Sequence, residues 1–319
     1  MKNILVFGKH GQVGRALQAL LPEGNHFAGR EQADLSKPET LKEFILKLKP
    51  SAIINAAAYT KVDKAEEEEA LAYAINAQSP AAMAEAAKEL DIPFVHISTD
   101  YVFDGEGTKP WTEDDKTAPQ NAYGRTKRAG EEKIEKVGGK YFIFRTSWVF
   151  DSVGPNFLVT MLRLGKEREE LRVVSDQVGA PTYAPHLAEA LLKTLDKFPL
   201  PFTGEGQGGG KNAAAFPPPN LPPQAGGGMS GIYHLCNRGE TSWHGFAEAI
   251  FREAKAKKME LKVERVLPIP SSAYPTPAKR PQNSRMDCSK AKRNLGIELP
   301  QWEEGLKAAL ELSKNVIPT

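Results

Sequence analysis

Residues 4–14 read ILVFGKHGQVG, an apolar run followed by glycines at Gly8, Gly11 and Gly14. An unbroken apolar run is typical of a strand that is buried on both faces of a parallel sheet. Glycines after such a strand allow a tight turn into a helix and a close approach of the backbone to a pyrophosphate. The helix N-terminus adds N–H donors and a positive dipole end. The stretch therefore predicts a dinucleotide-binding turn, although its spacing is GxxGxxG rather than GxGxxG.

The rest of the first half repeats this alternation of short apolar runs and helical patterns, which predicts a parallel sheet wound by helices. The expected strands are Ile4–Phe7, His26–Ala28, Ala52–Asn55, Phe94–Ser98 and Tyr141–Arg145. The expected helices between them cover residues 11–21, 38–49, 66–90 and 123–137. The fold class is therefore predicted to be α/β, a Rossmann-type doubly wound parallel sheet with a smaller C-terminal α/β substrate lobe.

Two parts are expected along the chain. Residues 1–150 are predicted to form the dinucleotide-binding domain, which also receives some later segments, and residues 151–319 mainly the substrate-binding lobe. Within the second part, residues 198–230 contain eight glycines and seven prolines. Such a composition buries too little apolar surface to offset its ordering entropy, so we predict a flexible insertion. The alternative interpretation of its prolines is a docking site for an SH3-like partner.

Composition narrows the classes of protein. The 319 residues carry 42 Lys and Arg against 40 Asp and Glu, without the concentrated basic excess of a nucleic-acid binder. No apolar stretch approaches the ~20 residues that span a bilayer, and no cleavable signal pattern is present, so a cytoplasmic protein is expected. Cys236 and Cys288 are too far apart in sequence for a CxxC site, and the six histidines lack metal-ligand spacing, so no metal is expected.

The end of the second strand predicts the choice of cofactor. An acidic residue there would accept a hydrogen bond from the ribose 2′-hydroxyl of NADH. This sequence has Arg30 instead, and a guanidinium suits the 2′-phosphate of NADPH. NADPH is therefore the preferred cofactor and NADH the second choice. Glu31 beside it, and the alternative that Arg30 is an ordinary surface residue, leave the preference open.

A second motif predicts proton transfer. Tyr123 and Lys127 are four residues apart in a predicted helix, so both side chains lie on one face. A nearby cation favours the phenolate and lowers the pKa of a tyrosine toward the working range. Thr99 at the end of a predicted strand can orient a substrate oxygen. These groups together suit hydride transfer between a nicotinamide and a carbonyl carbon.

The motifs resemble those of the extended short-chain dehydrogenase/reductase superfamily and, within it, the dTDP-4-dehydrorhamnose reductase family. The stretches that carry the resemblance include FGKHGQVG, INAAAYTKVDKAE, HISTDYVFDG, YGRTKRAGEE, RTSWVF, SDQVGAPT and GIYHLCNRGETSWHGFA. They run from residue 1 to about residue 315. The resemblance implies reduction of the C4 ketone of dTDP-4-dehydro-β-L-rhamnose to dTDP-β-L-rhamnose by NADPH or NADH, the last step of dTDP-L-rhamnose synthesis.

The resemblance also implies roles for single residues. Tyr123 is then the proton donor, Lys127 lowers its pKa and holds the nicotinamide ribose, and Thr99 positions the C4 oxygen. Asp100 contacts the sugar and Trp148 packs against it. The implied cofactor contacts are Gly8, Gly11, Gln12, Val13, Gly14, Arg30, Asp34, Leu35, Ala58, Tyr59, Thr60, Tyr123 and Lys127.

Several of these residues have a structural alternative. Asp34 can simply cap the helix near Pro38, Trp148 can be core, and Asp100 can shape a turn. Asn76 is either a packing residue or part of a proton relay. For the two arginines of RPQNSR, Arg280 and Arg285, diphosphate binding and a surface role are equally supported by charge alone.

Two other functions stay open. One is a reductase of a related dTDP-4-keto-6-deoxysugar, for instance one that gives the talose epimer. The other is a non-catalytic regulatory subunit that resembles the one of methionine adenosyltransferase. Some members of the family hold a magnesium ion between two subunits through a glutamate just after the glycine turn, where this chain reads Gly14-Arg15-Ala16-Leu17, without a carboxylate. A magnesium bridge is therefore not expected, and the chain is predicted to be a monomer or a homodimer.

Overall fold

The computed structural model describes residues 3–198 and 229–313. Its centre is a sheet of six strands in the order β10-β5-β4-β3-β1-β2, and every neighbouring pair is parallel. The strands are β1 (Ile4–Phe7), β2 (His26–Ala28), β3 (Ala52–Asn55), β4 (Phe94–Thr99), β5 (Tyr141–Thr146) and β10 (Gly231–His234). All residues of β1 and β3 are buried, as expected for the apolar run of β1 and for the apolar Ala52–Ile54 of β3.

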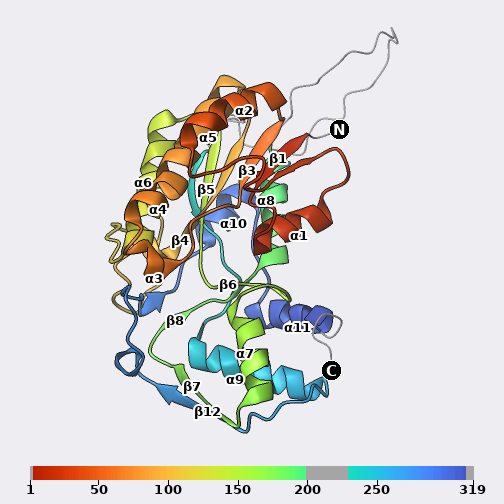
Figure 1. Cartoon of the computed structure of the whole chain (residues 1–319), viewed down its shortest axis with the longest axis vertical. Coiled ribbons are helices and arrows are strands. Elements are labelled where there is room, and N and C mark those ends of the chain that lie inside the picture. Colours follow the sequence, from red (N-terminus) through yellow and green to blue (C-terminus); the bar gives the residue numbers. More distant parts are fainter. Residues whose placement is uncertain (1–2, 199–228, 314–319) are drawn as a thin grey trace.

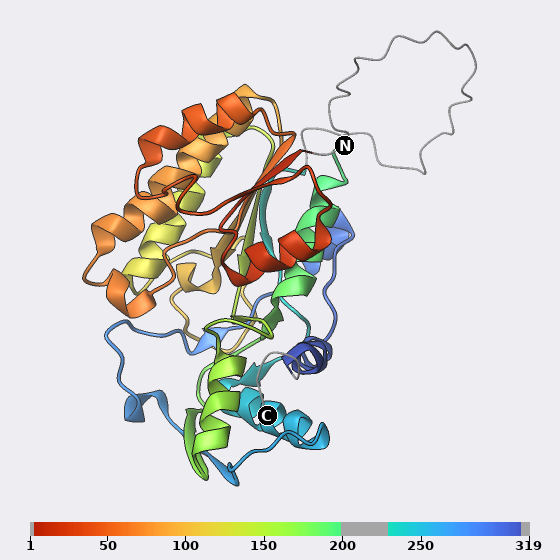
Figure 2. The ribbon, with the colours of Figure 1, turned by 45° about the vertical axis from the view of Figure 1, so that its right-hand side comes forward.

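Helices cover both faces of this sheet (Figures 1 and 2). One face carries α1 (Gln12–Leu20), α8 (Ala184–Leu195) and α10 (Ser289–Leu295), whose apolar residues share a core with β1 and β3. The other face carries α2 (Leu41–Leu48), α5 (Ser79–Glu89) and α6 (Ala122–Val137). The sheet is therefore doubly wound, and the predicted α/β fold class is confirmed.

The direction of winding reverses at β1, which pairs with β2 on one side and β3 on the other. Ligands of such sheets bind outside the carboxyl ends of the strands at this reversal. Gly8 follows β1 with φ +89°, and a Cβ there would lie 2.8 Å from the backbone of Ala56. A Cβ on Gly14 would collide with the Gly8 carbonyl. Both positions therefore require glycine for the close turn.

The second half of the chain builds a smaller α/β part below the sheet in Figure 1. Its helices are α7 (Phe157–Glu167), α9 (Trp243–Ala256) and α11 (Trp302–Ser313), which pack around their own apolar core. A parallel pair, β7 (Glu170–Val174) and β12 (Arg265–Ile269), covers α9. Because α8, β10 and α10 return to the sheet, the chain crosses between the two parts more than once. The division at residue 150 stays a prediction.

Short elements connect the two parts. The strand pairs are formed by β6 (Val149–Phe150) with β9 (Thr182–Tyr183), and by β8 (Val178–Gly179) with both β11 (Thr241–Ser242) and β13 (Asn283–Ser284). The single helical turns are η1 (Pro38–Thr40), α3 (Val62–Ala65), η3 (Asp100–Val102) and η4 (Ser271–Ala273). Most of these elements are too short for a periodic sequence signal and were not predicted; η1 lies at the start of the helix predicted over residues 38–49.

The single helix expected over residues 66–90 is wrong, because the structure divides it. α4 (Glu69–Tyr73) leads into a π-helical turn, η2 (Ala74–Gln78), before α5 begins. Pro80 lacks the N–H that would bond to the carbonyl of Asn76 four residues earlier. The N–H of Ser79 instead bonds to the carbonyl of Ala74, the five-residue spacing of a π turn.

The remaining expectations concern the predicted insertion, the two cysteines and membrane-spanning helices. Of the predicted insertion at 198–230, residues 199–228 lie outside the described residues. Cys236 and Cys288 are free thiols that lie together, with the Cys236 N–H donating to the Cys288 Sγ at 3.3 Å. Among the helices of residues 3–198 and 229–313, none has both the length and the apolar character needed to cross a membrane.

Candidate functional site

A cleft of about 770 Å³ lies at the carboxyl ends of the central strands. Many predicted site residues line it: Gly8, Gly11, Gln12, Val13, Arg30, Asp34, Leu35, Ala58, Thr60, Thr99, Asp100, Tyr123, Lys127 and Trp148. Gly14 and Tyr59 are not among the lining residues. Gly14 packs under the Gly8 carbonyl, and the Tyr59 hydroxyl donates to Glu68 Oε2 at 2.5 Å. The structure thus brings together most residues that the sequence places far apart.

The glycine turn has the form that a pyrophosphate requires. Gly11 is the N-cap of α1 and makes no side-chain capping bond, so the first N–H groups of α1 face the cleft without an internal cap. The Gly11 N–H donates to the Gly8 carbonyl at 2.9 Å, which closes the turn. Gln12 donates to the Val149 carbonyl at 3.2 Å and ties the turn to the strand β6. Backbone donors and a helix N-terminus therefore fit a dinucleotide.

Three hydroxyl and carboxyl groups meet opposite this turn. Thr99 ends β4, and its Oγ1 donates to Asp100 Oδ1 at 3.0 Å. Tyr123 lies in the first turn of α6, which Asn121 caps by accepting from the Gly124 N–H at 2.8 Å. A Cβ on Gly124 would collide with the Tyr101 carbonyl, so glycine lets α6 approach η3 closely. The aromatic rings of Tyr101 and Tyr123 lie edge to face at 5.4 Å.

Burial shifts the pKa values of Tyr123 and Lys127 in opposite directions. Burial raises the pKa of Tyr123 to about 12, and the Thr99 hydroxyl beside it acts in the opposite direction. Burial lowers the pKa of Lys127 to about 8, with the charge of Glu131 opposing this shift. The Lys127 Nζ donates to the Ile97 carbonyl at 2.6 Å. Burial thus makes Tyr123 a weak acid. The expected lowering of its pKa by Lys127 stays a prediction.

Asp100 places a buried carboxyl group in the cleft. The residue is 3% exposed, and burial raises its pKa to about 6 against the effect of the Ser284 and Thr99 hydroxyl groups. The backbone carbonyl of Asp100 closes the following turn by accepting from the Phe103 N–H at 3.1 Å. The Oδ2 atom is buried and has no hydrogen-bond partner in the described part of the chain. The carboxyl group lines the cleft, and backbone hydrogen bonds at Asp100 and Tyr101 also favour its charged form, so both a ligand contact and a role in the turn stay open.

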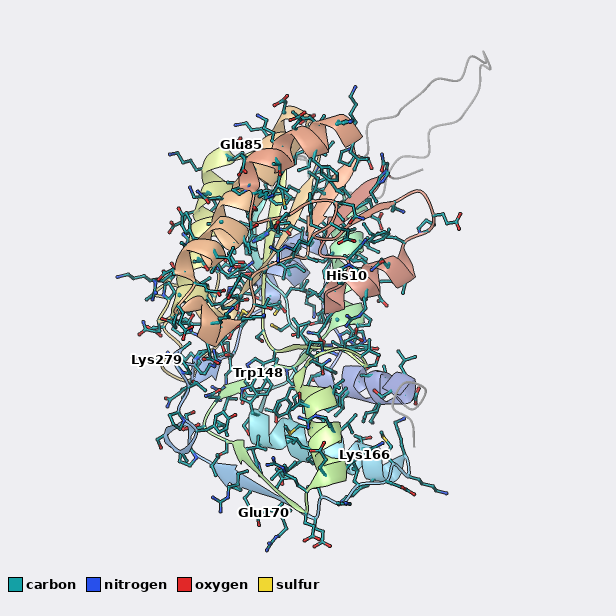
Figure 3. All side chains as sticks on the ribbon, in the orientation of Figure 1. His10, Glu85, Trp148, Lys166, Glu170 and Lys279 are labelled. Atoms are coloured by element: carbon teal, nitrogen blue, oxygen red, sulfur yellow. The ribbon has the colours of Figure 1, made fainter. Side chains whose placement is uncertain are left out.

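A pair of tryptophans forms the opposite wall. Trp148 stacks on Trp243 with ring centroids 3.7 Å apart, and both line the cleft. Figure 3 labels Trp148 between the sheet and the smaller part. Its backbone has φ +49°, a conformation that is uncommon for a residue other than glycine. Trp148 is half-buried rather than a core residue. Trp243 was not selected from the sequence, although it lies in the quoted ETSWHGFA stretch.

The residues at the adenosine end carry several charges. Arg30 is 82% exposed in its side chain, and its Nε lies 3.5 Å from Asp34 Oδ2. Glu31 pairs with Lys9 and lies 3.6 Å from His10 Nε2. Asp34 Oδ1 accepts from the N–H and hydroxyl of Ser36. It does not cap the next helical turn, whose N-cap is Lys37.

A second pocket, of about 640 Å³, is lined by one of the two arginines that could bind a diphosphate. Arg280 lines it and donates to Asp63 Oδ2 at 2.6 Å, while Arg280 Nη1 is buried without a partner among the described residues. Arg285 does not line it and pairs with Glu240 at 2.6 Å. Lys279 and the 63% exposed Tyr274 also line this pocket. The structure favours Arg280 over Arg285.

The side chain of Asn76 connects Tyr59, in the segment after β3, to Thr126 on α6. Its Oδ1 accepts from the Tyr59 N–H at 2.8 Å, and its Nδ2 donates to the Tyr59 carbonyl and to Thr126 Oγ1. Nearby on α6, Glu131 accepts two hydrogen bonds from Arg145 of β5, at 2.9 and 2.7 Å. These buried contacts fix the helix that carries Tyr123.

Arg15, just after the glycine turn, makes structural contacts. Arg15 donates to the carbonyls of His10 and Val153 and lies 3.7 Å from Asp151. It therefore joins the glycine turn to the segment that follows β6. Across residues 3–198 and 229–313, no three or more His, Cys, Asp or Glu side chains form a group that could hold a metal ion.

Comparisons with known proteins show the family of the chain. The family described as the RmlD substrate binding domain matches residues 1–201 and 222–315. The dTDP-4-dehydrorhamnose reductase of Shigella flexneri is 44% identical over 97% of both chains. The structure of a dTDP-4-dehydrorhamnose reductase from Clostridium acetobutylicum has 36% identity and a TM-score of 0.83, over 98% of this chain and 100% of its own.

A further solved structure holds a cofactor. The dTDP-4-dehydrorhamnose reductase of Bacillus anthracis, in complex with NADP, is 34% identical and superposes with a TM-score of 0.83, over 98% of this chain and 100% of its own. The family match and these relatives span nearly the whole sequence, including the glycine turn, the YxxxK pair and both tryptophans. This chain therefore belongs to the RmlD substrate binding domain family, the family of the dTDP-4-dehydrorhamnose reductases.

Proposed function

We propose that the chain reduces the C4 ketone of dTDP-4-dehydro-β-L-rhamnose to the hydroxyl of dTDP-β-L-rhamnose, with NADPH preferred over NADH. The observation that carries the proposal is the meeting of Thr99, Tyr123 and Lys127 with the glycine turn in one cleft. The names of the relatives at 44% identity and of the NADP complex support it. The chain acts as a monomer or a homodimer in the cytoplasm.

The cleft holds the cofactor along its predicted contacts. The backbone N–H groups at the start of α1 bind the pyrophosphate, and Gly8 and Gly14 allow the close turn that presents them. Arg30 binds the 2′-phosphate, and Asp34 with Leu35 meets the adenine. The wall of Ala58, Tyr59 and Thr60 follows β3 at the same edge. NADPH, when bound, supplies the hydride that goes to the sugar C4 atom.

The protein supplies the proton. Tyr123 gives its phenolic proton to the C4 oxygen as negative charge develops there, and Thr99 donates a hydrogen bond to the same oxygen. Lys127 in its cationic form stabilises the resulting phenolate and holds the nicotinamide ribose. The buried Asp100 carboxyl accepts from a sugar hydroxyl. One hydride and one proton added to the ketone balance the reduction.

The tryptophan pair and the second pocket place the rest of the substrate. The apolar face of the deoxysugar packs on Trp148, which Trp243 keeps in position by stacking. The diphosphate lies toward Arg280, whose unpartnered Nη1 can donate to it. Tyr274 offers an exposed aromatic face for the thymine base. Both pockets are thus used by one nucleotide sugar.

The identity of the product tests the proposal. We expect NMR of the sugar formed from dTDP-4-dehydro-β-L-rhamnose to show the rhamno configuration at C4. A talo-configured product would move the function to the related reductase. Binding of NADPH without any turnover of this or related 4-keto sugars would favour the regulatory-subunit alternative.

The cofactor preference gives a prediction for Arg30. Changing Arg30 to Asp removes a charge-assisted hydrogen bond to the 2′-phosphate, worth about 1.5–3 kcal/mol. The ratio of kcat/KM for NADPH over NADH should therefore fall roughly 10- to 100-fold. The matched control is Arg163→Asp, which changes the same charge on the exposed surface of α7. An unchanged ratio for Arg30→Asp would remove this residue from cofactor selection.

A further inference from the structure

Two buried polar side chains lie behind Lys127 and are not used in the reaction above. His96 of β4 and Asn55 of β3 are both fully buried and stand opposite each other in the sheet. The Asn55 Nδ2 lies 3.0 Å from His96 Nδ1. On the far side of the ring, His96 Nε2 lies 3.2 Å from Lys127 Nζ. A row of polar atoms therefore runs from β3 through the imidazole to the lysine.

The backbone fixes the direction of this row. Asn55 Oδ1 accepts from the Ala57 N–H at 3.1 Å, so the amide nitrogen must be the atom that faces the imidazole. An amide nitrogen only donates, and His96 Nδ1 must therefore accept. A neutral imidazole that accepts at Nδ1 carries its proton at Nε2. That proton points at Lys127 Nζ.

The position of this proton affects Lys127. An ammonium nitrogen has no lone pair, so only the neutral amine of Lys127 can accept from His96 Nε2–H. The amine keeps two hydrogens, one of which still bonds to the Ile97 carbonyl at 2.6 Å. With a charged Lys127, the proton of His96 would have to move to Nδ1. It would then face the Asn55 amide, unless Asn55 turned over and lost its bond to Ala57.

We propose that Asn55 and His96 are positioning residues which, through the Nε2–H tautomer of His96, favour release of the Lys127 proton in the free enzyme. The inference rests on the proposed function only in that Lys127 acts there as the cation beside Tyr123. It assigns a purpose to a buried histidine that touches neither substrate nor cofactor.

The groups around Lys127 agree with this assignment. Its titratable neighbours on the packed elements are Tyr123 and Glu131 on α6, His96 on β4, Asp100 on η3 and Arg145 on β5. Glu131 accepts from Arg145 and Arg128 and opposes loss of the lysine proton only through its charge. Burial, and then the charge of Lys127, hold the pKa of His96 well below its usual value, so its ring is neutral.

Nitrogen NMR of the imidazoles tests the tautomer directly. We expect the wild-type protein without cofactor to show His96 with Nε2 protonated and Nδ1 unprotonated at a pH above the Lys127 pKa of about 8, where Lys127 is the neutral amine. The signal is assigned by its loss in His96→Asn. This measurement needs no substrate, so it is independent of the proposed function. A His96 protonated at Nδ1 would overturn the proposal outright.

The substitution Asn55→Asp tests the effect on Lys127. The carboxylate can accept from both the Ala57 N–H and His96 Nδ1–H, which leaves a lone pair at Nε2 for the Lys127 ammonium. We expect the tautomer to reverse and Lys127 to hold its proton to higher pH. The alkaline midpoint of kcat/KM for NADPH, near the Lys127 pKa of about 8, should rise by about one pH unit. If the chain lacks reductase activity, the same shift is measured on the Kd for NADPH.

A matched pair elsewhere in the fold provides the control. Asn237 Nδ2 lies 2.9 Å from His186 Nδ1, and Asn237 Oδ1 accepts from the Tyr183 N–H at 2.9 Å. The change Asn237→Asp should reverse the tautomer of His186 and leave the alkaline midpoint unmoved. An Asn55→Asp protein that keeps the wild-type tautomer would contradict the proposal. So would a reversed tautomer with an unmoved midpoint.

Discussion

Replacing Tyr123 by phenylalanine is expected to lower kcat roughly 10²- to 10⁴-fold, the usual contribution of a general acid. The ring stays, and with it the edge-to-face contact to Tyr101, so the cleft keeps its shape. Only the phenolic hydroxyl is lost, and with it the transferable proton and the contact to Thr99. Because the pyrophosphate turn and Arg30 are untouched, the Kd for NADPH should change little. Steady-state kinetics and a fluorescence titration with NADPH measure the two quantities.

Tyr141→Phe is the control for this substitution. Tyr141 is the first residue of β5 and therefore lies at the amino ends of the strands, away from the cleft at their carboxyl ends. Loss of its hydroxyl should leave kcat near the wild-type value. A Tyr123→Phe enzyme with nearly normal kcat would show that the C4 oxygen takes its proton from another group.

The second large effect is expected on stability, from Glu131→Gln. Glu131 is 0% exposed and its partner Arg145 is 1% exposed, so the change leaves a buried guanidinium without its carboxylate. Removing one member of such a pair costs about 3–5 kcal/mol. Arg145 Nη1 already has no partner within the described residues. The free energy of unfolding in urea measures the loss.

Two further variants distinguish the loss of the buried ion pair from a nonspecific effect of the substitution on stability. The double variant Glu131→Gln/Arg145→Met removes both charges and should recover part of the lost free energy of unfolding. The exposed pair on α7 is the surface control, where Glu167→Gln should cost about 1 kcal/mol or less. A loss of equal size in Glu131→Gln and in the surface control would contradict the role of the buried pair.

The same pair gives a dependence of stability on pH. Burial alone would raise the pKa of Glu131, but the hydrogen bonds from Arg145 outweigh it and the pKa lies below its usual value. A carboxyl group with a lowered folded pKa stabilises the protein above its unfolded pKa. This part of the stability is lost as the pH falls through the folded value. The free energy of unfolding of Glu131→Gln should therefore decrease less on acidification than that of the wild-type protein, which urea unfolding at several pH values measures.

Much of the fold could be predicted because local patterns and the tertiary structure agree. The bounds of β1, β2 and β3 match the expected strands, and β1 shows why, since a strand buried on both faces needs an unbroken apolar sequence. The π turn at Asn76 could not be found this way. Its apolar periodicity is compatible with a continuous helix, and only the missing N–H of Pro80 points to the interruption.

The candidate site was predictable where a motif has its own chemistry. The glycine turn and the YxxxK pair have fixed spacings, and the structure places both at one cleft. Trp243 and His96 were missed for a different reason. Each acts through a partner distant in the sequence, Trp148 and Lys127, and a single sequence does not show which buried side chains meet.

The most direct measurement of the central claim is the absorbance of NADPH in the near ultraviolet. The purified chain is mixed with NADPH and dTDP-4-dehydro-β-L-rhamnose, with dTDP alone as the control. The account predicts consumption of one NADPH for each sugar reduced, and none with dTDP alone. A protein that binds NADPH and leaves its absorbance unchanged in the presence of this sugar would contradict the claim that the chain is its reductase.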